Sequence, residues 1–375
     1  MTDQPDLPDL AARSLGGSVI AANDEFFAEK ENLIKAEAPT FRPHTFTPKG
    51  QEYDGWETRR RRGDPGSDWV VVRLGAPGLV RSVVVDTAYF VGNYPESCTV
   101  EATAVEGYPA PSELDDHKWV ELVPRSPLQG NTANTFQVSN SQRFTHVRLT
   151  IHPDGGVARL RVLGEPLPDP RELADIPMDL VALLNGGRTT ACSDSFFSPP
   201  NNMLQPGESK FMSDGWETAR RRGEGNDWAV LRLAGAAVPK VAELSTLHYK
   251  GNPPHAISLL GSENPDDPDS WFPLLEHTEV LPDTRHRFRL SGNAPVTHVR
   301  LDIHPDGGVA RFRLWGKLTE DAATSQALSW FNLLPAEHAV AVLTGDCGLT
   351  EAAATEVVAA RPVTELPEEL ALIVR

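Results

Sequence analysis

The sequence THVRLTIHPDGGVARLRVLG, residues 145–164, occurs again at residues 297–316 as THVRLDIHPDGGVARFRLWG, with 16 of 20 positions identical. In residues 147–151 apolar side chains alternate with polar ones, which is the period-two pattern of a strand with one buried face. Pro153 ends this strand because it has no N–H for the sheet, and the Asp-Gly-Gly sequence after it predicts a turn. A second alternating segment follows at residues 158–162. We therefore predict a strand–turn–strand unit that is present twice.

Other segments are duplicated in the same order. DGWETRRRRG at residues 54–63 matches DGWETARRRG at residues 214–223 in nine of ten positions, and a tryptophan-bearing strand pattern at 68–74 returns at 227–233. A repeat of about 150 residues is too long for a solenoid, so it indicates a duplicated domain. Short strand patterns separated by Gly, Pro, Asn and Asp favour an antiparallel β-sandwich or jelly roll.

The C-terminal segment has a different composition. It is rich in alanine with helical spacing of its apolar residues, Gly345 and Gly348 suggest a break between two helices, and Pro362 ends the second. Because it is too short for a good core of its own, we expect it to pack on the sandwich or on a partner chain in a homo-oligomer. The expected order is a flexible N-terminus (1–15), a first β-sandwich (16–166), a linker with a short helix (167–184), a second β-sandwich (185–317) and a helical tail (325–375).

Composition excludes several classes of protein. A net charge of −17 argues against binding to nucleic acid or to an anionic membrane surface. Cys98, Cys192 and Cys347 lie far apart and form no CxxC pair, so neither a disulfide framework nor a structural zinc site is predicted. The acidic N-terminus has no secretory pattern, and no apolar run approaches the ~18 residues of a membrane span. We expect a soluble, cytoplasmic protein.

The most unusual residues are charged and lie in the predicted loops. The arginine run at residues 59–62 either forms a solvated, salt-bridged loop or binds an anion, since guanidinium groups bind carboxylates bidentately. Alternation predicts that Arg59 and Arg61 share one side, and their counterparts in the second repeat are Ala219 and Arg221. The first of these positions differs, so the two copies need not be equally active.

A histidine stands two residues before an aspartate in both repeats. His152 with Asp154, and His304 with Asp306, are candidates for proton transfer, with the aspartate orienting the imidazole. The spacing also permits a divalent metal such as Mn²⁺, but one His-x-Asp pattern does not define a metal site, and we assign no ligand. The structural alternative is a satisfied histidine beside a turn aspartate.

The ordered set DGWETRRRRG, DW-x-V-x-RL, GNYP and IHPDGGVARLRVLG resembles the allantoicase family. The resemblance covers residues 16–317 and both repeats. It implies hydrolysis of allantoate to ureidoglycolate and urea in allantoin (purine) degradation. It also implies two jelly-roll domains similar to galactose-binding and discoidin-type modules. The tail sequence WFNLLPAEHAVAVLTGDCG resembles the first helices of the decarboxylase that acts on the ureidoimidazoline product of urate oxidation, without the part that carries that family's catalytic histidine. We therefore expect a remnant or a docking element there and no decarboxylase activity.

Allantoate has one carboxylate and two ureido groups, which gives the candidate residues roles. Arginines would bind the carboxylate, Glu57 and Glu217 would act as general bases or bind ureido N–H groups, and the His–Asp pairs would protonate the departing nitrogen. The alternatives are that Asp54 caps a turn, that Glu57 neutralises an arginine and that Asn93 occupies a turn. The predicted catalytic residues are Glu57, His152, Asp154, Glu217, His304 and Asp306, and the predicted substrate-binding residues are Asp54, Arg59, Arg61, Asn93, Asp214, Arg221 and Asn252.

Two further expectations concern mechanism and class. No Ser-His-Asp order, GxSxG elbow or activated cysteine is visible, so we expect direct attack by water. The alternative function is a non-catalytic, discoidin-like module that binds a small molecule or carbohydrate. Such modules favour exposed aromatic side chains in their loops, whereas the loops of both repeats carry Arg, Glu, His and Asp.

Overall fold

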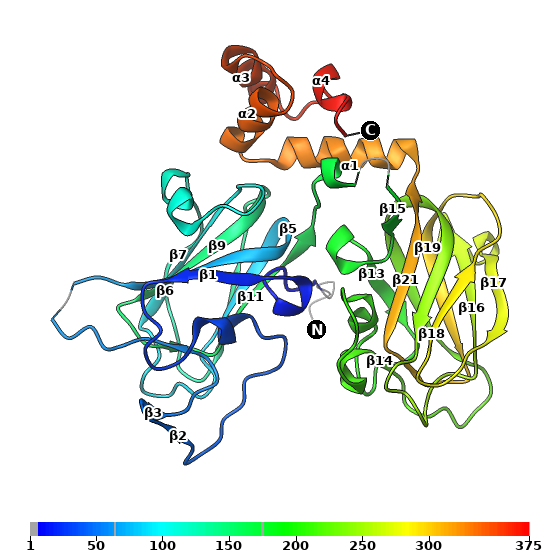
Figure 1. The fold of residues 1–375 in the computed structure, drawn as a ribbon, viewed down its shortest axis with the longest axis horizontal. Helices are drawn as coiled ribbons and strands as arrows, with labels where there is room; N and C mark the ends of the chain where they lie inside the picture. Colours follow the sequence, from blue (N-terminus) through cyan, green and yellow to red (C-terminus); the bar gives the residue numbers. More distant parts are fainter. Residues whose placement is uncertain (1–6, 64, 174–175, 375) are drawn as a thin grey trace. The chain divides into compact units, whose positions relative to one another are not determined.

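The computed structural model describes residues 7–63, 65–173 and 176–374, and the chain forms two compact units. The first unit contains the chain up to Leu167 together with residues 333–345 and 349–358, and the second contains the rest. Each unit is an antiparallel β-sandwich with short helices in its loops, and α-helices occur only in the C-terminal part of the described chain (Figure 1). The predicted all-β fold with a helical tail is confirmed.

A single long strand organises the first sandwich. The first half of β5 (Asp68–Asp86) pairs with β1 and β9, and its second half pairs with β8 and β11, so both layers share this strand. The order of the larger layer is β1-β5-β9-β6-β7. The other elements of this unit are β1 (Ser18–Ala22), β2 (Phe46–Thr47), β3 (Gly50–Gln51), β4 (Trp56–Glu57), β6 (Ser97–Thr103), β7 (Val120–Pro127), β8 (Ala133–Gln137), β9 (Arg143–His152), β10 (Gly156–Val157), β11 (Arg159–Pro166), η1 (Arg13–Leu15), η2 (Lys30–Ile34) and η3 (Pro111–Asp116).

The second sandwich repeats this plan around β15 (Asp227–Ser245), which pairs with β13 and β19 and then with β18 and β21. Its remaining elements are β12 (Met178–Asp179), β13 (Arg188–Cys192), β14 (Trp216–Glu217), β16 (Ala256–Ser262), β17 (Phe272–Glu279), β18 (Arg285–Arg289), β19 (Val296–His304), β20 (Gly308–Val309), β21 (Arg311–Leu318), η4 (Pro170–Glu172), η5 (Leu183–Asn185), η6 (Pro200–Leu204), η7 (Met212–Asp214) and η8 (Pro268–Ser270).

The alternation that predicted the strands also marks the core. On β9 the side chains of Val147, Leu149 and Ile151 are completely buried, and so are Leu160 and Val162 on β11. Burying one such aliphatic side chain contributes roughly 1.5–3 kcal/mol. The strand–turn–strand unit therefore forms in each repeat because its apolar face has the opposite layer to pack against.

Each sandwich begins earlier than the sequence analysis expects. Residues 1–6 of the predicted flexible N-terminus lie outside the described residues, but Leu10 is fully buried and its N–H donates to the Val162 carbonyl oxygen at 2.7 Å. In the second unit Leu180 donates to the Leu314 carbonyl oxygen in the same way, so the last part of the predicted linker belongs to that sandwich. The boundaries at residues 16 and 185 were too late, because these edge contacts involve too few residues to show alternation.

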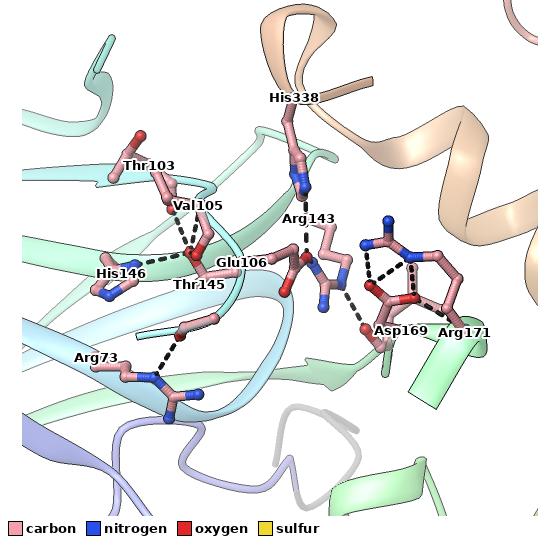
Figure 2. A network of polar contacts seen from close by, with 12 residues as sticks. Arg73, Thr103, Val105, Glu106, Arg143, Thr145, His146, Asp169, Arg171 and His338 are labelled. Atoms are coloured by element: carbon pink, nitrogen blue, oxygen red, sulfur yellow. Dashed lines mark hydrogen bonds and ion pairs between the residues drawn. The ribbon is translucent and has the colours of Figure 1, made fainter. Parts of the chain in front are cut away.

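The tail forms the helices α1 (Glu320–Leu333), α2 (Ala336–Gly345), α3 (Glu351–Ala359) and α4 (Glu368–Ala371). Residues of α2 and α3 belong to the first unit, where Glu106 forms an ion pair with Arg143 and lies 3.6 Å from Nε2 of His338 in α2 (Figure 2). Arg143 is only 1% exposed and also donates to the Leu167 carbonyl oxygen. Part of the tail thus packs on the first sandwich, as expected. No helix in the described ranges has both the length and the apolar character needed to cross a bilayer.

Candidate active site

Three loops meet at one end of the first sandwich and bring the candidate residues together. β4, from the DGWE sequence, pairs with β10, which follows the Asp-Gly-Gly turn, so that Glu57 is opposite Gly156. The loop between β5 and β6 joins them because the Asn93 carbonyl oxygen accepts a hydrogen bond from the Gly156 N–H at 2.8 Å. In the second sandwich Glu217 is opposite Gly308, whose N–H donates to the Asn252 carbonyl oxygen at 2.9 Å.

The first glycine of each Asp-Gly-Gly sequence permits this close approach. Gly155 has φ = 137° and Gly307 has φ = 132°, values that side-chain-bearing residues rarely adopt. A Cβ atom on Gly155 would lie 2.7 Å from the Asn93 carbonyl oxygen, and one on Gly307 would lie 2.7 Å from that of Asn252. The turn therefore holds an asparagine beside the β4 or β14 glutamate.

A glutamate–asparagine hydrogen bond is the main polar contact of each site. Asn93 Nδ2 donates to Glu57 Oε1 at 2.7 Å, and Asn252 Nδ2 donates to Glu217 Oε1 at 2.7 Å. Burial raises the pKa of both glutamates, and the amide hydrogen bond only partly opposes this rise. A carboxylate with a raised pKa is a stronger base near neutral pH, which suits it for taking a proton from water.

Arg60, which the sequence analysis did not select, faces the first of these sites. Its guanidinium forms an ion pair with Asp154 at 2.9 Å and donates to the Gly92 carbonyl oxygen at 3.1 Å. Its charge also opposes the rise in the pKa of Glu57. Alternation gave no reason to select Arg60, and it does not apply here because the arginine run is an irregular loop.

We call these residues the loop clusters. The first loop cluster contains Glu57, Arg60, Asn93 and Asp154, and the second contains their counterparts Glu217, Arg220, Asn252 and Asp306.

The arginines that were predicted to bind substrate have partners within their own domain. Arg59 pairs with Asp24 at 3.0 Å with its side chain 65% exposed, and Arg61 pairs with Asp68 at 2.8 Å. In the second repeat Arg221 pairs with Asp227 in the same way as Arg61. The pairs of Arg61 and Arg221 fix each loop to the start of the long strand, and a direct role of these arginines in substrate binding stays a prediction.

The aspartates that open the DGWE sequences lie beneath the loops. Asp54 accepts a hydrogen bond from Arg159 at 2.7 Å, and Asp214 accepts one from Arg311 at 3.0 Å. Burial opposes ionisation of Asp54, but hydrogen bonds from Arg159 and Thr40, with the nearby positive charges, lower its pKa to about 2. Since Arg159 is 1% exposed, this pair supports the loop, and contact of Asp54 with substrate stays a prediction.

The two His–Asp pairs do not form hydrogen-bonded dyads within the described chain. The His152 ring nitrogens contact Ser67 Oγ at 2.6 Å and Thr99 Oγ1 at 3.0 Å. His304 Nε2 contacts Ser258 Oγ at 3.0 Å, and its ring lies 4.7 Å from that of His277. Burial lowers the pKa of both His152 and His304. Arg125 lowers the pKa of His152 further, whereas His277 and Asp302 have opposite effects on that of His304. Both shifts favour the neutral imidazole, and the catalytic role of these histidines stays a prediction.

No group of three or more His, Cys, Asp or Glu side chains in residues 7–63, 65–173 and 176–374 has the arrangement of a metal site. The loop clusters contain groups that can take part in acid–base and hydrogen-bonding chemistry. A carboxylate base, an amide and a guanidinium suit a small substrate that has both amide-like and anionic groups.

The fold and these loops define a class of protein built from two β-sandwich repeats, each with the same kind of polar site. The chain matches the family model described as "Allantoicase repeat" over residues 8–167 and 178–319. It is 54% identical over 315 residues to a probable allantoicase of Nocardia farcinica, covering 84% of this chain and 95% of the relative. It is 50% identical over 330 residues to a probable allantoicase of Streptomyces coelicolor, covering 85% and 87%.

A solved structure agrees. The crystal structure of allantoicase from Saccharomyces cerevisiae is 35% identical and superposes with a TM-score of 0.73, covering 84% of this chain and 95% of that one. This chain belongs to the allantoicase family. The helices from Glu320 onward lie outside the matched repeats.

Proposed function

We propose that this protein is an allantoicase, which hydrolyses allantoate to ureidoglycolate and urea in purine degradation, and that the loop clusters carry out the reaction. The observation that carries the site assignment is the glutamate–asparagine hydrogen bond, which has the same length of 2.7 Å in both repeats. Each glutamate has a raised pKa and ends a short strand, with an arginine nearby in the sequence.

The products define what the site must do. The oxygen of water bonds to the central methine carbon of allantoate, and the bond from that carbon to one ureido nitrogen breaks. One proton leaves the water and one proton reaches the departing nitrogen, so urea is released and a hydroxyl remains on the carbon. The site therefore needs a base, a proton donor and an anchor for the carboxylate.

The loop clusters can supply these groups. Glu57 or Glu217 takes the proton from water and, once protonated, can return it to the departing nitrogen. Asn93 and Asn252 each donate one amide N–H to the glutamate, which leaves the amide oxygen to accept a ureido N–H. An arginine of the loop binds the carboxylate, which keeps the substrate in one orientation.

Urea release from allantoate by the purified full chain tests this proposal. The double variant Glu57→Gln/Glu217→Gln should lower kcat by about 100-fold or more, because it removes the base from both clusters. The control is Glu276→Gln, which changes an exposed glutamate of β17 and should keep the wild-type rate. Parallel assays with EDTA and with added Mn²⁺ measure any dependence on a divalent metal.

Two outcomes contradict different parts of the proposal. If the folded wild-type protein releases no urea with or without Mn²⁺, the proposed activity is wrong. If the double variant keeps the wild-type rate, the activity stands and the loop clusters are the wrong site. Thermal unfolding of every variant shows whether a lost rate reflects a lost fold.

We further propose that copies of the chain associate. Exposed phenylalanine pairs support this, since Phe26 and Phe27 are 43% and 39% exposed and Phe196 and Phe197 are 72% and 61% exposed. Light scattering of the purified chain measures its mass, and a monomer at micromolar concentration would contradict association.

The three unpaired cysteines of the chain support action in a reducing compartment such as the cytoplasm.

A further inference from the structure

The two loop clusters differ in the state of their arginine. In the first repeat the Arg60 guanidinium already has partners, because it forms an ion pair with Asp154 at 2.9 Å and donates a hydrogen bond to the Gly92 carbonyl oxygen. Its counterpart Arg220 is exposed and makes no hydrogen bond or ion pair within the described chain. The same sequence position therefore carries a neutralised cation in one repeat and a free cation in the other.

The aspartates show the same difference. Asp154 is 3% exposed and uses both carboxylate oxygens, one with the Arg60 guanidinium and the other with the Arg61 N–H at 2.7 Å. Asp306 accepts only the Arg221 N–H, at 2.8 Å, and its other oxygen has no partner among the described residues. The first cluster thus contains an ion pair between its own arginine and aspartate, and the described residues of the second cluster show no such pair.

A substitution at the edge of the cluster increases this difference. Arg59 forms an ion pair with Asp24, whereas Ala219 at the matching position has no charged group to offer Asp194. The backbone of both loops is held in the same way, because each aspartate still accepts the N–H of the residue at this position. The second repeat therefore keeps the backbone hydrogen bond of the loop but lacks the arginine side chain that forms an ion pair in the first repeat.

These contacts determine which cluster can bind an anion. A substrate carboxylate that approaches Arg60 must displace Asp154, a buried carboxylate fixed next to it by the fold. A carboxylate that approaches Arg220 displaces only water. Since a guanidinium can bind one carboxylate through two parallel hydrogen bonds, the free arginine is the better anchor.

We infer that the second repeat holds the working site, that Arg220 binds the carboxylate of the substrate, and that Asp154 occupies the equivalent position on Arg60 in the first repeat. This inference rests on the proposed function and assigns it to one of the two clusters.

The experiment compares two arginine variants by urea release from allantoate. Arg220→Ala should lower kcat/KM at least 30-fold more than Arg60→Ala does, mainly through KM, because the carboxylate is bound before and during the reaction. Arg220→Lys should recover part of the loss, since lysine keeps the charge without the planar fork. Arg222→Ala is the matched control, because it removes another exposed arginine of the same loop and should keep the wild-type rate.

The outcomes separate this inference from the proposed function. A wild-type chain that releases no urea contradicts the function. A wild-type chain that is active, with equal losses in both variants or a larger loss in Arg60→Ala, overturns the assignment to the second repeat. Arg220 is exposed and makes no hydrogen bond or ion pair with residues 7–63, 65–173 or 176–374, so its alanine variant should melt at the wild-type temperature.

Discussion

Replacing Gly307 by alanine should destabilise the second sandwich and reduce turnover, although the new methyl group carries no chemistry. Gly307 has φ = 132°, a region that costs other residues about 1–3 kcal/mol. The added Cβ would also lie 2.7 Å from the Asn252 carbonyl oxygen and 2.8 Å from the backbone of Pro253 and Pro254. Backbone cannot rotate away as a side chain can, so the loop around Asn252 must move.

Together these costs amount to about 2–4 kcal/mol of unfolding free energy. For a domain of this size that corresponds to a fall of roughly 5–15 °C in the melting temperature. Because the Asn252 side chain is bonded to Glu217, movement of this loop also displaces the proposed base, and kcat should fall about tenfold or more.

Thermal unfolding and urea release measure the two effects on the same preparation. The matched control is Gly223→Ala in the same repeat, where a Cβ meets nothing within 4 Å, and its stability should stay within about 0.5 kcal/mol of wild type. If Gly307→Ala melts with the control and keeps its rate, the loop is not built on this glycine and the geometry given for the site is wrong.

Three further predictions concern the support of the fold. Since the pKa of Asp54 is lowered to about 2, its ionised form stabilises the protein above pH 4 and that contribution disappears as the pH falls from 4 to 2. Allowing for its partial exposure, we expect about 1 kcal/mol, and Asp54→Asn should flatten the dependence of melting temperature on pH in this window. Glu106→Gln leaves the buried Arg143 without its carboxylate and should cost about 2–4 kcal/mol, so an unchanged melting temperature would contradict the role of this pair. Leu301→Ala removes a fully buried side chain of β19 and should cost about 2–5 kcal/mol in denaturant titration, whereas less than 1 kcal/mol would place this residue outside the core.

Side-chain alternation predicted the strands because it reports directly on which face is buried. The same rule does not apply to the arginines, since residues 58–61 are irregular in the structure and nothing fixes successive side chains to opposite sides. Arg60 could be recognised only when the fold brought Asp154 and Gly92 beside it, and these lie in two other loops. Local patterns therefore predict the strands of the sandwich. Which residues form a site made by three loops depends on contacts between segments that are far apart in sequence.

Proximity in sequence was also misleading for the histidines. His152 and Asp154 are two residues apart, yet the histidine ends a strand while the aspartate begins a turn, and their side chains bond to different partners. Glu57 and Asn93 are far apart in sequence and share a hydrogen bond of 2.7 Å. A hydrogen bond between residues of two loops leaves no local pattern in a single sequence. The only indication in the sequence was that the motifs containing Glu57 and Asn93 both occur again in the second repeat.

The two repeats differ least where a residue supports the loop and most where it borders the site. The ion pair between Arg61 and Asp68 beneath the first loop has its counterpart in the second, because a buried carboxylate without its cation costs several kcal/mol. At the edge, Arg59 is replaced by alanine, and this loss leaves the fold intact because the Ala219 N–H still bonds to Asp194. A duplicated domain can therefore change the residues at the edge of its site at little cost in stability. One copy can pair its arginine with its own aspartate, while in the other copy the matching arginine can bind a substrate.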